Sequence, residues 1–253
     1  MTDGSALVDI LSIIGVLLAG TAIVAGAVLK GAGLHALLSW AAFMIVMVGT
    51  LAAICVQTPL EVMRRALVMF PWVFRPPART PEAQIRKLVD WSGISRKQGL
   101  LGLEPVLGRE SDPFLRRGLQ LVVDGNSPDA IRATLEVDMQ VREAADLRAA
   151  RVFEGMGVYS PTLGIIGAVL GLMAVMQHLA DPSELGHGIA AAFTATVYGI
   201  GMANLLFLPM ANKLKVAVHA HAHVHAMLIE GLIGIAQGDN PRSIDTRLRS
   251  YLS

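Results

Sequence analysis

Residues 155–180 read GMGVYSPTLGIIGAVLGLMAVMQHLA, a stretch of 26 residues without one Asp, Glu, Lys or Arg. An α-helix of about 20 residues spans the roughly 30 Å hydrocarbon core of a bilayer. A helix in the core of a soluble protein rarely needs that length without a single charge. The stretch therefore predicts a transmembrane helix.

Three further stretches have the same character. They cover residues 10–29, 31–60 and 185–212, and each has at least 20 residues without a charge. The first follows the segment Met-Thr-Asp-Gly-Ser, which has an acid and no base, and a second apolar stretch comes at once. A cleaved signal peptide is therefore not indicated. The sequence predicts four transmembrane helices.

The composition agrees with a membrane protein. Of the 253 residues, 53% are hydrophobic and only 16% are charged, whereas globular domains are about 25% charged. The mean hydropathy of +0.54 and these fractions exclude a disordered chain and an ordinary soluble enzyme. The net charge of +1 provides no basic field for nucleic acid. Cys55 is the only cysteine, which excludes an intrachain disulfide and a cysteine-rich metal site.

The distribution of basic residues predicts the orientation in the membrane. Lys30 is the only Lys or Arg between the first two stretches, and residues 181–184 contain none. The other 20 of the 21 bases lie in residues 64–151 and after residue 212. Because cytoplasmic loops carry the excess of Lys and Arg, these regions and both termini are expected to be cytoplasmic.

The predicted organisation has four parts, all of them α-helical. Transmembrane pairs occupy residues 1–60 and 155–212, a large cytoplasmic helical insert occupies 61–154, and a C-terminal helix and tail occupy 213–253. No alternating strand pattern of useful length appears, so the fold class is an all-α membrane protein.

Helix starts in the insert have a capping residue followed by proline. These starts are at Thr80-Pro81, Asp112-Pro113 and Ser127-Pro128. Ser95 and Gln98 form a candidate capping box for a fourth start. The helix from Pro128 has no clear stop before residue 180, and the fourth span continues to about Ala236. Both helices are expected to project far into the cytoplasm.

Residues 69–74 are aromatic-rich and precede Arg75-Pro76-Pro77. Two interpretations are open for this segment. It is either an interfacial segment at the membrane surface or a turn packed on the helical insert.

The four spans contain hydroxyl groups and lack any carboxylate or fixed base. A charge near the bilayer centre costs about 2.5–3.5 kcal/mol on insertion scales and usually has a function where it occurs. This chain alone therefore has no buried carboxylate relay for protons. Thr194, Thr196 and Tyr198 lie close together beside small residues, which favours a pore-lining role. The alternative is that each hydroxyl bonds to its own helix backbone.

The last two spans are rich in glycine and contain two prolines. Gly167 and Gly171 form a GxxxG motif, which permits close approach of two helices. Pro161 and Pro209 interrupt the helical pattern, and an interior proline frees the carbonyl group four residues back. Each proline predicts either a static kink or a hinge.

Four histidines alternate with small or apolar residues: His219, His221, His223 and His225. On a helix they form two pairs on different faces, which makes a poor single metal site. A solvated or packed helix face is the favoured interpretation, and a metal site is the alternative.

Three segments carry a resemblance to a known family. They are residues 159–172 (YSPTLGIIGAVLGL), 196–209 (TVYGIGMANLLFLP) and 230–242 (EGLIGIAQGDNPR). The chain resembles, over almost its full length, the MotA/PomA-type A subunit of the bacterial flagellar motor stator, within the MotA/TolQ/ExbB proton-channel superfamily. TolQ and ExbB relatives have three spans, which argues against them. A TolQ/ExbB-like channel that energises outer-membrane processes is the first alternative function, and a membrane enzyme with a histidine metal site is the second.

The resemblance implies an assembly and a location. Such A subunits form a ring of five around two copies of a MotB/PomB-type B subunit in the bacterial inner membrane, in contact with lipid. The B subunit contributes the membrane Asp that carries the ion, which fits the missing carboxylate here. The resemblance implies no enzyme activity, cofactor or nucleic-acid partner.

The resemblance also implies roles for individual residues. Arg96, Lys97 and Glu104 match the charged residues that contact the rotor's switch-complex protein. Arg96 and Glu104 are eight residues apart, a little over two helical turns, so both are expected to face one partner. Pro161 and Pro209 match the two prolines linked to conformational change at the channel.

The transported ion follows from three positions. Ala168 and Ala195 stand where sodium-driven relatives typically have Thr, while Thr196 keeps a second Thr of that pattern. A methyl group cannot ligate Na⁺, whereas oxygen atoms can. The resemblance therefore implies protons rather than Na⁺.

Overall fold

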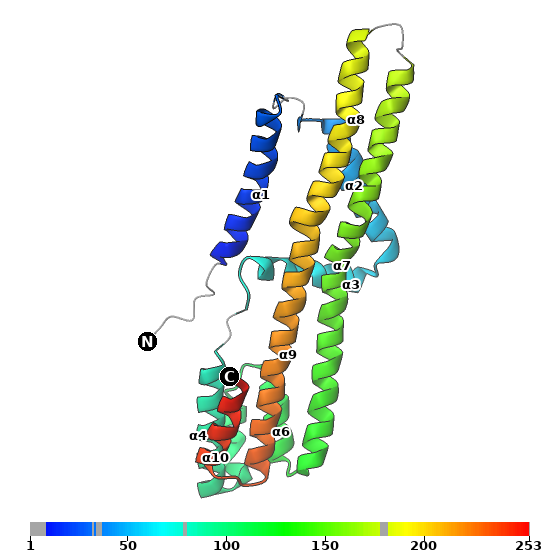
Figure 1. Cartoon of the computed structure of the whole chain (residues 1–253). Coiled ribbons are helices and arrows are strands. Elements are labelled where there is room, and N and C mark those ends of the chain that lie inside the picture. The colour runs from blue at the N-terminus through cyan, green and yellow to red at the C-terminus, as the bar shows by residue number, and fades with distance from the viewer. Residues whose placement is uncertain (1–8, 32, 34–36, 78–79, 178–181, 253) are drawn as a thin grey trace. The chain divides into compact units, whose positions relative to one another are not determined.

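The computed structural model describes residues 9–31, 33, 37–77, 80–177 and 182–252, and within them every regular element is a helix. The four predicted spans are present as helices long and apolar enough to cross a membrane (Figure 1). They are α1 (Ile10–Leu29), α2 (Trp40–Gln57), α7 (Pro128–Met176), and a continuous fourth helix made of α8 (Pro182–Met202), η4 (Ala203–Phe207) and α9 (Leu208–Ala236). The predicted all-α membrane fold is confirmed.

The remaining elements are shorter. They are α3 (Leu60–Met69), η2 (Phe70–Val73), α4 (Pro81–Gln98), η3 (Leu100–Leu103), α5 (Glu104–Leu107), α6 (Pro113–Val123), α10 (Pro241–Arg249) and η5 (Ser250–Leu252). The long helices predicted from Pro128 and through Ala236 are both present.

The chain divides into two compact units. Among the described residues, those of 77–145 and 217–252 form the helical unit, and those of 9–76 and 146–216 form the membrane unit. Helices α7 and α9 each contribute to both units. The insert expected at 61–154 therefore contributes its two ends to the membrane unit and only its middle part to the helical unit.

The helical unit is held by one apolar core. Side chains of α4, α6, the first turns of α7, the last turns of α9 and α10 meet there and are almost fully buried. Its largest fully buried members include Leu88, Phe114, Leu119, Leu135 and Leu232. Each comes from the apolar face of an amphipathic helix, as burial of such faces requires.

Helix starts in this unit follow the capping rules at two of the predicted sites. Asp112 Oδ1 accepts hydrogen bonds from the backbone N–H groups of Phe114 and Leu115, at 2.8 and 3.2 Å. Ser127 Oγ accepts from the N–H of Ala130 at 3.3 Å. At the third site α4 begins at Pro81, with no side-chain bond from Thr80.

The fourth predicted start, at Ser95, is wrong. Ser95 lies inside α4 and is only 8% exposed, because this face of α4 packs into the core of the helical unit. The helix ends at Gln98, and Gly99 follows with a φ of 75°, a left-handed conformation that favours glycine. Burial therefore keeps this segment in the interior of a helix, although its local capping pattern predicts a helix start.

Helices α7 and α8 of the membrane unit approach until their backbones touch. A Cβ atom placed on Gly199 would lie 2.6 Å from the carbonyl oxygen of Ser160 and 2.9 Å from Cα of Gly164. Cβ atoms on Gly167 and Gly171 would lie 2.8 and 3.0 Å from side-chain carbons of α8. Ser160, which is fully buried, donates its hydroxyl hydrogen to the carbonyl of Gly199 at 3.0 Å. The GxxxG glycines thus serve the contact with the chain's own next helix.

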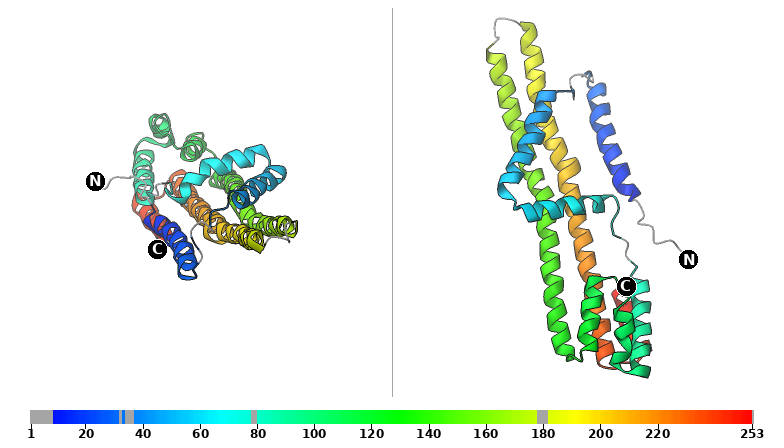
Figure 2. Two further views of the ribbon diagram at one scale, coloured as in Figure 1. Left: turned by 90° about the horizontal axis from the view of Figure 1, so that it is seen from above. Right: turned by 180° about the vertical axis from the view of Figure 1, so that it is seen from behind.

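The aromatic segment 69–74 belongs to the membrane unit. The Nε of Arg65 on α3 donates to Asp146 of α7 at 2.6 Å, and the ring of Phe70 lies 6.1 Å from that of Phe153. Asp146 and Phe153 both lie within the insert expected at 61–154, so these contacts agree with the alternative interpretation, a turn packed on this insert. Figures 1 and 2 show α3 and η2 crossing the direction of α7, and Leu67 is 67% exposed. This geometry suits the interfacial interpretation.

Helix α1 makes few contacts along its length. It has no buried residue, and in both views of Figure 2 it stands apart from the α7–α8 pair. Its first turn is attached to the rest of the membrane unit, because the N–H of Asp9 donates to the carbonyl of Phe74 at 2.9 Å.

The backbone contact predicts the effect of a side chain at Gly199. We expect Gly199→Val to separate α7 from α8, because the atoms it meets are backbone and cannot rotate away. Overpacking of this kind costs about 1–3 kcal/mol, so the thermal unfolding midpoint of the purified protein in detergent should fall. Gly26→Val on α1 is the matched control, since no atom lies within 4 Å of its Cβ position. An equal loss in both variants would contradict the contact.

Candidate functional site

The three hydroxyl groups predicted to line a pore, on residues 194, 196 and 198 of α8, do not share one face. Thr194 is 5% exposed, and its hydroxyl donates to the carbonyl of Ala190 on its own helix at 2.9 Å. Tyr198 donates its hydroxyl hydrogen to the carbonyl of Leu37, between α1 and α2. Thr196 is half-buried and, among the described residues, has no hydrogen-bond partner. Residues two apart on a helix point about 200° apart, so Thr196 faces away from the other two.

The two alanines lie on facing helices. Ala195 is 1% exposed, and its Cβ lies 2.8 Å from the Cβ position of Gly167 on α7. Its carbonyl oxygen lies 2.8 Å from the Cβ position of Gly164. The methyl group of Ala195 therefore fills the α7–α8 contact, whereas Ala168 on α7 is half-buried.

The two prolines, far apart in the sequence, belong to neighbouring turns of the membrane unit. Helix α7 stays continuous through Pro161. One turn earlier, a Cβ atom on Gly157 would lie 2.6 Å from the side chain of Leu208, which directly precedes Pro209. The carbonyl that Pro161 leaves without its helical donor is that of Gly157. The residue whose carbonyl Pro161 frees is therefore in contact with the residue that precedes Pro209.

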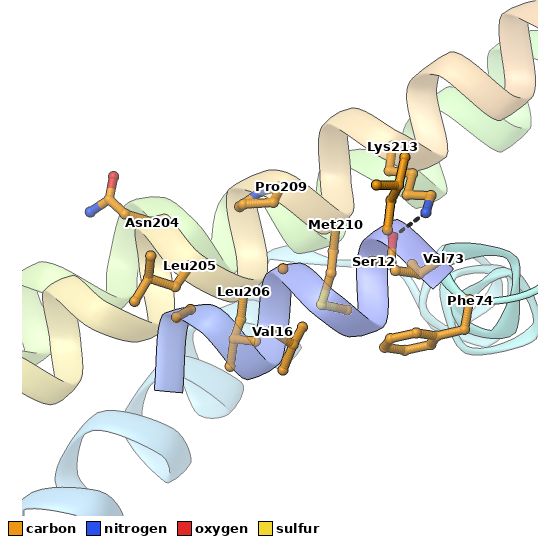
Figure 3. A pocket seen from close by; sticks show the side chains of 13 residues that line it. Ser12, Val16, Val73, Phe74, Asn204, Leu205, Leu206, Pro209, Met210 and Lys213 are labelled. Atoms are coloured by element: carbon orange, nitrogen blue, oxygen red, sulfur yellow. Dashed lines mark hydrogen bonds between the residues drawn. The ribbon is translucent and has the colours of Figure 1, made fainter. Parts of the chain in front are cut away.

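A π turn precedes Pro209. Element η4 (Ala203–Phe207) is a π-helix, and the N–H of Leu208 donates to the carbonyl of Ala203, five residues back. The side-chain amide of Asn204 donates to the carbonyl of Ile200 at 3.0 Å. Figure 3 shows Asn204 and Pro209 on this stretch, with Leu206 and Met210 directed towards α1. Such turns are rare and are frequent at functional sites, and only Pro209 hinted at this one in the sequence.

The predicted rotor-contact residues lie at the end of α4 and at the start of α5. Arg96 and Lys97 are exposed in its last turn, and Glu104 is exposed at the first position of α5. The expectation that Arg96 and Glu104 share one helix is wrong, because Gly99 ends α4 and reverses the chain. Element η3 then packs back on α4, where the Cβ position of Gly102 lies 2.6 Å from Cβ of Gln98.

These three charges are available to a partner. No ion pair among the described residues uses Arg96, Lys97 or Glu104, although other charged groups of the helical unit are paired. Lys87, for example, pairs with the buried carboxylate of Glu110 at 3.1 Å. Two bases at the end of α4 and one acid at the start of α5 therefore have no ion-pair partner among the described residues.

The histidines of α9 pack or reach solvent individually. His219 Nδ1 lies 2.9 Å from Glu143 Oε1, and the ring of His225 stacks on Phe114 with centroids 4.1 Å apart. Burial lowers the pKa of His225 to about 4, and the neighbouring His221 adds to this, so the ring is neutral at pH 7. Among the described residues, no group of three or more His, Cys, Asp or Glu is placed to hold a metal ion.

Polar contacts between distant helices were missed by sequence reasoning. Tyr159 donates its hydroxyl hydrogen to Gln57 Oε1 at 2.8 Å, and Lys215 Nζ donates to Glu154 at 2.7 Å. All four residues lie near the ends of apolar stretches. Polar side chains are expected there because water can solvate them, with no need for a partner in the chain. Nothing in the sequence pairs residues that are 61 or 102 positions apart.

Comparisons with known proteins agree over almost the full chain. The family model for the MotA/TolQ/ExbB proton channel family matches residues 108–227. The chain is 36% identical to Motility protein A of Bacillus subtilis (strain 168) over 245 residues, which cover 96% of this chain and 91% of that protein. The solved structure of C. jejuni MotAB has a TM-score of 0.91 and 31% identity, over 97% of this chain and 96% of that one.

A second solved structure supports the same relation. The flagellar MotAB stator complex from Bacillus subtilis has a TM-score of 0.88 and 36% identity, and the likeness covers 95% of each chain. The chain therefore belongs to the MotA/TolQ/ExbB proton channel family, as a member of its MotA/PomA type.

Proposed function

We propose that the chain is the A subunit of a bacterial flagellar motor stator, which couples ion flow across the inner membrane to torque on the rotor. The observation that carries this proposal is the likeness in sequence and fold, over nearly the whole chain, to proteins solved as MotAB stator complexes. Moving one charge through the membrane potential releases roughly 2.3 kcal/mol per 100 mV. The subunit converts this free energy into motion without covalent chemistry.

The proposed assembly is a ring of five A chains around two copies of a MotB/PomB-type B subunit. Two features support it. The spans have no carboxylate, so the ion-carrying group has to come from another chain. The membrane unit also exposes many large apolar side chains, among them Ile165, Val169 and Phe193, which a neighbouring helix or lipid has to cover. The distribution of Lys and Arg residues along the chain supports cytoplasmic termini.

Assembly is tested by native mass spectrometry of the complex purified with its B subunit. The expected mass corresponds to five A chains and two B chains. The B chains are needed because the A chain has no carboxylate in its spans to carry the ion. A stable A-only monomer that conducts ions in proteoliposomes is the result that would exclude this assembly.

The proposed rotor contact is the charged end of α4. Arg96, Lys97 and Glu104 are exposed and unused by the fold, which leaves them for a charged partner such as the rotor's switch-complex protein. The turn at Gly99 separates the end of α4, with Arg96 and Lys97, from the start of α5, with Glu104.

Charge reversal tests this contact. Arg96→Glu and Glu104→Lys should each reduce torque while leaving membrane insertion and B-subunit binding intact, since close charge pairs contribute about 1.5 kcal/mol or more. A compensating reversal on the rotor protein should restore part of the torque. Arg86→Glu, exposed on the same helix, is the matched control. Normal swimming by both reversals, alone and combined, would show that the contact lies elsewhere.

The proposed transported ion is the proton. Ala195 presents only a methyl group and is closed into the α7–α8 contact, and Ala168 is likewise without an oxygen ligand. The hydroxyl of Thr196 has no hydrogen-bond partner among the described residues. A proton passes along single hydrogen bonds, whereas Na⁺ has to replace its hydration shell with several oxygens.

Swimming speed tests the ion and the role of Thr196. Speed should not depend on external Na⁺ and should collapse with a protonophore. Thr196→Ala should slow or stop rotation, because it removes the hydroxyl, whereas Thr196→Ser should keep much of the speed. Speed that follows Na⁺ concentration at constant proton-motive force would overturn the ion and leave the stator function standing.

The proposed bending point lies where the Pro161 turn of α7 meets Leu208 and Pro209. Two weakened stretches of backbone in contact concentrate flexibility at one level of the membrane unit. The π turn supports this proposal, because it has the longer and weaker hydrogen-bond repeat.

A further inference from the structure

The membrane unit contains a groove between α1 and the fourth helix. One cavity of about 360 Å³ lies between α1, η2 and the start of α9, and a second of about 380 Å³ lies between α1, α8 and residues 37–38. The two cavities share Val16, Ala19, Leu205 and Leu206 in their linings, so they form one continuous groove. Its volume is in the range of sites that hold small ligands, about 300–1,000 Å³.

Among the described residues, the hydrogen bonds and the ion pair that join α1 to the rest of the membrane unit lie at its N-terminal end. Gly15 and Gly20 line the groove, and no atom lies within 4 Å of the Cβ position of either residue. At the N-terminal end of α1, Lys213 of α9 donates to Asp9 Oδ2 and to Ser12 Oγ. This attachment and the bond from Asp9 to Phe74 set the distance between α1 and α9.

The lining changes from charged to apolar along the groove. Figure 3 shows Lys213 and Ser12 joined at one end, with Val16 and Leu206 further along. Beyond them the second cavity is lined mainly by aliphatic side chains, including Ile23 and Val24. A lysine ammonium has three donors, and Asp9 and Ser12 use two of them, so one donor is left for a further acceptor.

The length of the groove matches one leaflet. Ser12 and Val24, which line the two ends of the groove, are 12 positions apart on α1, about 18 Å at 1.5 Å per residue. Half of the hydrocarbon core is about 15 Å. An apolar space of this size inside the hydrocarbon region holds no stable water, because water there lacks polar partners.

We propose that one phospholipid from the leaflet on the Lys213 side occupies this groove. Its phosphate accepts a charge-assisted hydrogen bond from Lys213. An acyl chain of the lipid runs along Val16, Ala19 and Leu205. The charged end and the apolar remainder of the lining match the phosphate and the acyl chain of a phospholipid.

Photo-crosslinking in the complex with the B subunit tests what fills the groove. We would introduce p-benzoylphenylalanine at Val16 in the groove or at Leu18, which is 63% exposed and outside the lining. The complex is washed extensively in detergent, irradiated and measured by intact mass spectrometry. The expected result is one phospholipid adduct at Val16, and only detergent adducts or unmodified chain at Leu18.

Two other outcomes would overturn the proposal. An adduct of Val16 with a second A chain or with the B subunit would assign the groove to a protein helix. Detergent adducts at both positions would show that the groove binds no lipid more firmly than the general surface.

A filling variant provides an independent measurement. Gly15→Phe places a ring in open space within the groove, so it should reduce the phospholipid retained per A chain several-fold relative to Leu18→Phe. Unchanged lipid in Gly15→Phe would also overturn the proposal. Because neither readout uses torque or ion flow, a negative result would leave the stator function untouched.

Discussion

The contact between the backbones of α7 and α8 is the constraint on which the membrane unit depends. In a bilayer no hydrophobic force draws apolar helices together, so association relies on close packing and interhelical hydrogen bonds. Gly164 and Gly199 remove the side chains that would keep the helices apart, and Ser160 adds a buried hydrogen bond at the same level. These residues fix the position of the segment of α8 that contains Ala195, Thr196 and Tyr198.

The same contact explains why the hydroxyl residues have separate environments. With Ala195 turned to α7, its neighbour Thr196 points elsewhere, and Tyr198 reaches the carbonyl of Leu37. The close pair also brings the Pro161 turn against Leu208, beside the π turn. Tight packing and weakened backbone thus lie next to each other in one unit. Helix α1 takes no part in this packing, which leaves its groove for a molecule of the surrounding bilayer.

The charged residues are distributed differently from the packing contacts. Bases are almost absent from the predicted spans and from the loops expected on the far side of the membrane, so membrane insertion and orientation follow from composition. In the helical unit the buried acid Glu110 is paired with Lys87, since an unpaired buried charge is costly. Arg96, Lys97 and Glu104 are exposed and have no ion-pair partner among the residues described, and this costs little free energy because water solvates them.

The sequence by itself determined the number of spans, the all-α class, the long helices from Pro128 and to Ala236, and the caps at Asp112 and Ser127. These features depend on local composition, periodicity and neighbouring residues, which a linear reading contains. Only the tertiary structure decided that Ser95 lies inside α4, that Arg96 and Glu104 belong to different helices, and that Lys213 holds Asp9. Burial, a left-handed turn at Gly99 and contacts across 204 positions decide these points, and each depends on residues brought together by folding.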